Sequence, residues 1–102
     1  MIAVLTEHRD DIIALCERFG VRRLGVFGSA TGDEFDPAHS DVDFLVELEP
    51  PEGTSRFDAF FGFREALEQL LGYPVDLVDP SALDNPYFAG AVRRTLHELY
   101  AA

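Results

Sequence analysis

Two aspartates alternate with apolar residues in the segment Ser40-Asp41-Val42-Asp43-Phe44-Leu45-Val46. Successive side chains of a β-strand point to opposite faces, so Asp41 and Asp43 would share one face, about 6–7 Å apart along the backbone. The apolar residues between them share the other face, and Pro50-Pro51 ends the segment. The pattern predicts a strand with one apolar face and two carboxylates on the opposite face.

Further elements are expected before this strand. A helix over residues 6–19 is indicated because apolar side chains recur at three- and four-residue steps, with Thr6 as a cap and Gly20 as a stop. A β-rich run follows over residues 21–27 and breaks at Gly28-Ser29, where a loop or short helix begins. The first half of the chain therefore predicts a helix, a strand and a short connection to the acidic strand.

The second half of the chain predicts two helices with a strand between them. A wide apolar stripe indicates a largely buried helix that starts at residues 54–55 and ends at Leu71. A short strand over residues 75–78 follows. The last helix is expected to begin at Asn85, a favourable cap, and to continue through Leu99.

The element order αβ(α)βαβα predicts an α/β (α+β) fold, in which helices pack on one face of a small mixed sheet. A single domain is expected over residues 1–102, with 47% hydrophobic residues to build its core. The lone cysteine, Cys16, closes no disulfide and supplies no metal cluster. No apolar run approaches the about 20 residues that cross a bilayer, so we expect a cytoplasmic protein without membrane contact.

The charge balance limits the choice of partners. The chain has 19 acidic against 8 basic residues, a net charge of −11, and no lysine. Direct binding to nucleic acid is not expected, because it requires clustered lysines and arginines. A basic protein partner, or an anionic ligand bridged by a metal ion, fits this charge better.

Three carboxylates are candidates for metal binding. Asp76 lies within the apolar run of residues 75–78, and it would join Asp41 and Asp43 if the two strands are neighbours. Converging carboxylates suit two Mg²⁺ ions that assist phosphoryl or nucleotidyl transfer. The alternative is that Asp41 and Asp43 form only a solvated strand face in an acidic chain.

Gly28 and Ser29 are candidates for phosphate binding. A glycine at the end of a strand lets the backbone approach a ligand closely, and a helical turn after it offers free N–H groups. The hydroxyl of Ser29 adds a donor. The alternative is an ordinary turn between a strand and a helix, with Ser29 as its cap.

These segments together resemble a known family. The run Val26-Phe27-Gly28-Ser29, then Gly32, and the acidic strand with Asp41 and Asp43 resemble the Gly-Ser and Asp-x-Asp signature of the DNA polymerase β-like nucleotidyltransferases. More narrowly, the chain is similar to the minimal nucleotidyltransferases (MNT) that act as antitoxins to HEPN ribonuclease toxins. The resemblance covers nearly the whole chain and includes the strand that carries Asp76.

The resemblance implies an activity and a set of roles. It implies Mg²⁺-dependent transfer of AMP from ATP to a hydroxyl, usually of a tyrosine, on a HEPN toxin that is thereby silenced. Gly28 and Ser29 would bind the triphosphate, Asp41 and Asp43 would hold both metal ions, and Asp76 would bind the catalytic metal and help to deprotonate the acceptor. A hetero-oligomer with the toxin would then form.

The sequence also departs from the family and leaves alternatives open. Thr31 precedes Gly32 where many members carry an arginine. Four arginines are candidates to replace it: Arg22, Arg23, Arg56 and Arg64. An antitoxin that neutralises its toxin by stoichiometric binding alone is the main functional alternative. Transfer to a small molecule or to an RNA end is a third hypothesis, although no residues remain for a separate acceptor domain.

Overall fold

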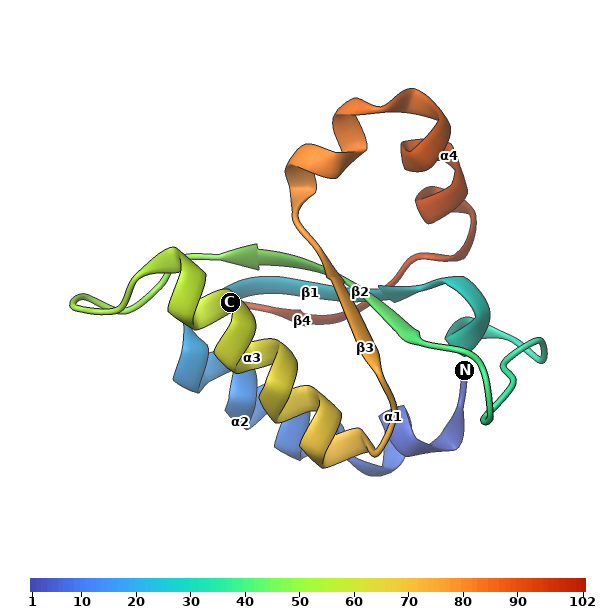
Figure 1. Ribbon diagram of the computed structural model, residues 1–102, viewed down its shortest axis with the longest axis horizontal. Helices are drawn as coiled ribbons and strands as arrows, with labels where there is room; N and C mark the ends of the chain where they lie inside the picture. Colours follow the sequence, from blue (N-terminus) through green and yellow to red (C-terminus); the bar gives the residue numbers. More distant parts are fainter.

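The computed structural model describes residues 1–102, and it shows a mixed sheet of four strands in the order β3-β2-β1-β4 (Figure 1). The α-helices are α1 (Ala3–Glu7), α2 (Arg9–Phe19), α3 (Arg56–Leu71) and α4 (Pro86–Thr95). The strands are β1 (Val21–Phe27), β2 (Val42–Leu48), β3 (Val75–Val78) and β4 (His97–Ala101). Two short 3₁₀ helices, η1 (Gly28–Thr31) and η2 (Pro80–Asp84), complete the chain.

The sheet combines antiparallel and parallel pairing. Strand β1 pairs antiparallel with both β2 and β4, whereas β2 pairs parallel with β3. The parallel pair needs a crossover, and α3 supplies it between β2 and β3. This arrangement confirms the predicted α/β class with a small mixed sheet.

The main core lies between the sheet and the pair α2 and α3, which cover one of its faces (Figure 1). Phe44 of β2 and Phe63 of α3 are fully buried there. Helix α3 begins at the cap Ser55, whose hydroxyl accepts the N–H of Asp58, and it ends at Gly72 in the left-handed conformation. The prediction of a largely buried helix is therefore only partly right: Ala59, Phe63, Leu67 and Leu71 are buried, whereas Phe57 and Phe61 are exposed.

The opposite face of the sheet is partly covered as well. Helix α4 and η2 stand on the side of the sheet away from α2 and α3 (Figure 1). Phe88 of α4 packs edge-on against Phe27 of β1, with ring centroids 6.1 Å apart. The prediction that helices pack on one face holds for α2 and α3, but α4 lies on the other side of the sheet.

Two predicted helices differ from the observed ones. The helix expected over residues 6–19 is divided at His8 into α1 and α2, and α1 already starts at Ala3. The last helix, expected to continue through Leu99, ends at Thr95 because Leu96 adopts an extended conformation. Residues His97–Ala101 instead form β4, which pairs with the edge of β1.

No helix of the chain combines the length and the apolar character required to span a membrane.

Candidate active site

The structure brings the predicted carboxylates together on the sheet face opposite α2 and α3. The parallel register of β2 and β3 places Asp43 directly beside Asp76. Both alternate with residues buried in the core, such as Val42 and Phe44, so their side chains point to the other face. Asp41 is exposed and directly precedes β2. We call this side of the sheet the open face.

The carboxyl group of Asp43 is held in an environment that disfavours its charge. Burial first, and then the negative charges of Asp76 and Asp41, together raise its pKa from 3.8 to about 6. Phe27 lies directly across from Asp43 in β1 and is itself buried. No salt bridge joins Asp43 to a cationic side chain. The site is therefore short of positive charge, and a bound cation would relieve the repulsion.

Gly28 brings the backbone close to this carboxylate. Its φ angle is +79°, a left-handed conformation that favours glycine. A Cβ atom at this position would lie 2.5 Å from Oδ2 of Asp43, so any side chain would collide with the carboxylate. The turn after β1 and the acidic strand are thus packed directly against each other at Gly28.

The turn at Gly28 is fixed by two hydroxyl groups. The N–H of Gly28 donates a 2.8 Å hydrogen bond to Oγ1 of Thr95, the last residue of α4. The hydroxyl of Thr31 donates to the carbonyl oxygen of Gly28 at 2.7 Å. The sequence predicted a helix that continues beyond Thr95 and gave no sign of this contact. Only the spatial proximity of α4 to β1 reveals it.

A groove of about 550 Å³ lies beside Gly28 and Ser29, between η1 and the end of α4. Its lining residues are Gly28, Ser29, Thr31, Gly32, Asp33, Glu34, Ala91 and Thr95. Ser29 is half-buried in this lining, and η1 has no side-chain cap. The interpretation of Ser29 as a simple cap is therefore wrong, and its hydroxyl remains available to a ligand.

None of the four arginines considered as replacements at Thr31 lines this groove. Arg22 pairs with Glu49 and Arg23 with Glu98, both on the sheet. Arg56 donates to the carbonyl oxygen of Leu48. Arg64 stacks over a phenylalanine ring on α3. The arginines that belong to the groove's own helix are Arg93 and Arg94 in the last turn of α4, which sequence reasoning did not consider.

The donor set suits a hard divalent cation. Asp43 and Asp76 offer carboxylate oxygens from neighbouring strands, and Asp41 can add a third group. No three of the chain's His, Cys, Asp and Glu side chains already surround one point as metal ligands. A cation held by Asp43 and Asp76 would therefore complete its shell with water or phosphate oxygens, as Mg²⁺ commonly does.

Comparison with known proteins places this geometry in a family. A model of the nucleotidyltransferase domain matches residues 12–98. The chain is 40% identical over 97 residues to the protein adenylyltransferase MntA of Thermococcus cleftensis, covering 95% of this chain and 87% of the relative.

Two solved structures share the fold. A candidate minimal nucleotidyltransferase superposes with a TM-score of 0.66 at 34% identity, covering 91% of this chain and 90% of that one. The MNT antitoxin bound to the tri-AMPylated HEPN toxin of Shewanella oneidensis gives a TM-score of 0.63 at 20% identity, covering 95% of this chain and 72% of the solved chain. The chain therefore belongs to the nucleotidyltransferase domain family.

Proposed function

We propose that this protein is an antitoxin and a Mg²⁺-dependent protein adenylyltransferase, which transfers AMP from ATP to a hydroxyl group, that of a tyrosine, on a partner HEPN toxin. The observation that carries the proposal is the placement of Asp43 beside Asp76, against the Gly28 turn, without a cationic side chain to balance them. The adenylyltransferase name of the Thermococcus relative supports the same activity.

Each residue has a role in this proposal. The groove at Gly28 and Ser29 would take the β- and γ-phosphates through the Ser29 hydroxyl and the N–H groups of η1. Asp41, Asp43 and Asp76 would hold Mg²⁺ next to the α-phosphate. When bound there, Mg²⁺ would lower the pKa of the acceptor hydroxyl and neutralise charge that develops on the phosphates. Asp76 is exposed and would accept the proton of the acceptor.

The charge of the chain supports a protein as the acceptor. The net charge of −11 favours association with a basic partner surface. The solved MNT antitoxin that shares this fold is bound to a HEPN toxin, which supports a protein partner of that class. A hetero-oligomer of antitoxin and toxin is therefore part of the proposal, and ATP is the proposed nucleotide.

The second candidate function is neutralisation by binding alone, without transfer of AMP. The acidic surface favours it, because an acidic protein could cover the active site of a ribonuclease that binds RNA through basic residues. In that case the carboxylates at Asp41 and Asp43 would act only as surface charge.

Intact mass spectrometry separates the two functions. The HEPN toxin of the Shewanella complex, and any HEPN protein encoded next to this chain, would be incubated with the chain, ATP and Mg²⁺. We expect the toxin to gain one or more AMP units, and the Asp41→Asn/Asp43→Asn variant to transfer none. The double variant Asp10→Asn/Asp11→Asn, on the exposed first turn of α2, makes the same charge change and should transfer normally.

A binding measurement completes the test. If the Asp41→Asn/Asp43→Asn variant still binds the toxin but no longer protects cells from it, neutralisation depends on catalysis. Full protection by this variant, with no mass gain in any toxin sample, would refute the enzymatic proposal and leave neutralisation by binding.

A further inference from the structure

A second, smaller pocket lies on the open face and has no role in the function proposed so far. It has a volume of about 240 Å³ and is bounded by β1, β2, η2 and the start of β4. Its apolar part comes from Leu45, Pro80, Leu83 and Leu96, and its charged rim from Arg23, Glu47 and Glu98. The floor includes Gly25, where a Cβ would lie 2.6 Å from Cδ1 of Leu96.

The carboxylates lie between this pocket and the groove at Gly28. The register of β1 and β2 pairs Phe27 with Asp43, and then Gly25 with Leu45. Gly28 follows Phe27 at one end of β1, whereas the pocket begins at Gly25, toward the other end. With a rise of about 3.3 Å per residue, Leu45 lies about 7 Å along β2 from Asp43. Groove, carboxylates and pocket therefore follow one another along the strands.

This order matters for a displacement at phosphorus. In nucleotidyl transfer the attacking oxygen and the leaving oxygen lie on opposite sides of the phosphorus atom. If the leaving pyrophosphate is held at Gly28 and Ser29, the α-phosphate lies near Asp43 and Asp76. The acceptor then has to approach from the side of Leu45, which is the side of the pocket.

We propose that this pocket receives the aromatic ring of an acceptor tyrosine, presented by a basic segment of the partner protein. The inference rests on the function proposed above and adds to it the residues that select the acceptor. A volume of about 240 Å³ is below the roughly 300–1,000 Å³ of pockets that enclose whole small molecules, and it suits one side chain. An aromatic ring gains from burial against the leucines, and its hydroxyl would point along β2 toward Asp43 and Asp76.

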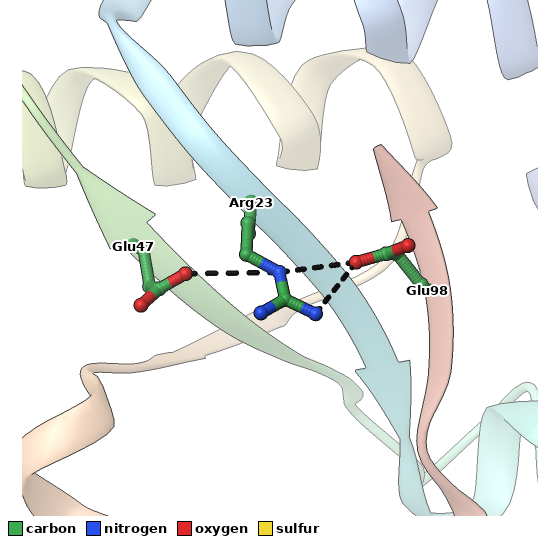
Figure 2. A network of polar contacts seen from close by, with 3 residues as sticks. All are labelled: Arg23, Glu47 and Glu98. Carbon is green, nitrogen blue, oxygen red and sulfur yellow. Dashed lines mark hydrogen bonds and ion pairs between the residues drawn. The ribbon is translucent and has the colours of Figure 1, made fainter. Parts of the chain in front are cut away.

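The rim of the pocket explains the preference for a basic segment. Figure 2 shows Arg23 of β1 lying between Glu47 of β2 and Glu98 of β4. Nε of Arg23 is 3.0 Å from Oε1 of Glu98 and 3.8 Å from Oε2 of Glu47. Two carboxylates share one guanidinium, so the rim keeps a net negative charge that attracts a cationic neighbour of the tyrosine.

Transfer to a tyrosine held in this pocket forms one bond to phosphorus and breaks one. The phenol oxygen forms a bond to the α-phosphorus of ATP, and the bond from that phosphorus to the bridging oxygen of pyrophosphate breaks. Pyrophosphate leaves toward Gly28 and Ser29, and the phenol proton passes to the carboxylate of Asp76 and then to water. The products are the tyrosyl-AMP ester on the partner, pyrophosphate and one proton.

Binding can be tested without turnover by NMR titration of the wild-type chain. The first probe is a short peptide with one tyrosine between two arginines; its controls carry alanine in place of tyrosine, or glutamates in place of the arginines. We expect the tyrosine-arginine peptide to shift the Gly25 amide and the Leu83 and Leu96 methyl signals, and both controls to shift them less. A non-hydrolysable ATP analogue with Mg²⁺ should shift Gly28 and Ser29 and leave the Leu83 methyl signals in place.

The opposite result would overturn the inference. If the ATP analogue shifts Leu83 and Leu96 while the peptide does not, the pocket binds the nucleobase. If neither probe shifts them, the pocket is no ligand site. Should the peptide bind there although no partner gains AMP, the binding site stands and the proposed enzymatic function fails.

A variant pair tests the same inference during transfer. Leu83→Trp fills the pocket from η2, and we expect it to raise the KM for the acceptor protein about ten-fold, or about 1.4 kcal/mol, while the KM for ATP stays the same. Gln69→Trp, on the exposed side of α3, adds the same side chain elsewhere and should change neither constant. Unchanged acceptor KM in a folded Leu83→Trp protein would refute the subsite but leave the transferase proposal intact.

Discussion

The two faces of the sheet are built from the same strands but obey different constraints. Along β2, Val42, Phe44 and Val46 pack against α2 and α3, and each has at most 1% of its surface exposed. The residues that alternate with them along the strand, such as Asp43 and Glu47, point to the open face and keep contact with solvent. Residue choice on the covered face is therefore governed by the transfer of apolar surface from water. On the open face it is governed by the interactions between charged groups.

The difference shows that one strand can separate stability from function at single-residue intervals. A substitution on the buried face should change the free energy of unfolding, whereas its neighbour on the open face should change binding and catalysis. The glycines follow the same division: Gly28 is required by the site, but Gly90 of α4 meets no atom within 4 Å of an added Cβ.

The largest effect is expected on the buried face. Phe44→Ala should lower the free energy of unfolding by about 3–5 kcal/mol, because it removes a fully buried ring and leaves a cavity. The neighbouring Leu45 is half-buried on the open face, so Leu45→Ala should lower the free energy of unfolding by only about 1 kcal/mol. Urea unfolding followed by circular dichroism measures both. Equal losses would mean that the open face contributes to the core as much as the covered face does.

Much of this division could be predicted from the sequence, because a strand has a period of two. The alternation of aspartates with Val42, Phe44 and Val46 was sufficient to assign the faces of β2. Strand β4 could not be predicted in this way. No glycine or proline separates Thr95 from His97, and the apolar spacing through Leu99 also fits a helix. The free edge of β1, which pairs with these residues, becomes known only in three dimensions.

The site was predictable to a similar degree. Gly28, Ser29 and the three aspartates were predicted as candidates from the sequence pattern and the family resemblance, and the structure places Asp43 beside Asp76. The hydrogen bond from Gly28 to Thr95 joins residues far apart in the sequence, so no local pattern could reveal it. The same applies to the division of the first helix at His8, since no breaker residue marks it.

The next largest effect is expected at Gly28. Gly28→Ala should destabilise the protein by about 2 kcal/mol, because it combines a left-handed φ with a Cβ 2.5 Å from Oδ2 of Asp43. The matched variant Gly90→Ala should instead stabilise α4 by about 0.5–1 kcal/mol. Thermal unfolding of both proteins checks the signs. A stabilising Gly28→Ala would show that the turn and the acidic strand are not packed as described.

The pH dependence of stability should depend on Asp43. Its pKa is about 6 in the folded protein and 3.8 ordinarily, so the unfolded chain releases this proton first as the pH rises. Stability is therefore lost between about pH 4 and pH 6, and after allowance for partial exposure the loss is about 1–2 kcal/mol. The variant Asp43→Asn lacks this loss.

Urea unfolding at about pH 5 and about pH 7.5 tests this dependence. The gain in the free energy of unfolding of Asp43→Asn over wild type should be larger at the higher pH than at the lower one. Added Mg²⁺ should raise the stability of the wild type at the higher pH and leave the variant nearly unchanged, because binding to the folded state alone stabilises it. Parallel pH profiles of the two proteins would show that Asp43 is not electrostatically strained.

The smallest effect is expected at Thr95, which links α4 on the open face to the turn after β1. Thr95→Val keeps the shape of the side chain but leaves the N–H of Gly28 without its acceptor, at a cost of about 1 kcal/mol. Thr95→Ser retains the hydroxyl and should lose less. Hydrogen exchange of the Gly28 amide is the sharper measurement, since its protection should fall in the valine variant and persist in the serine variant. Equal protection in both would mean that the turn is held by its packing against Asp43, and that α4 does not position the groove at Gly28 and Ser29.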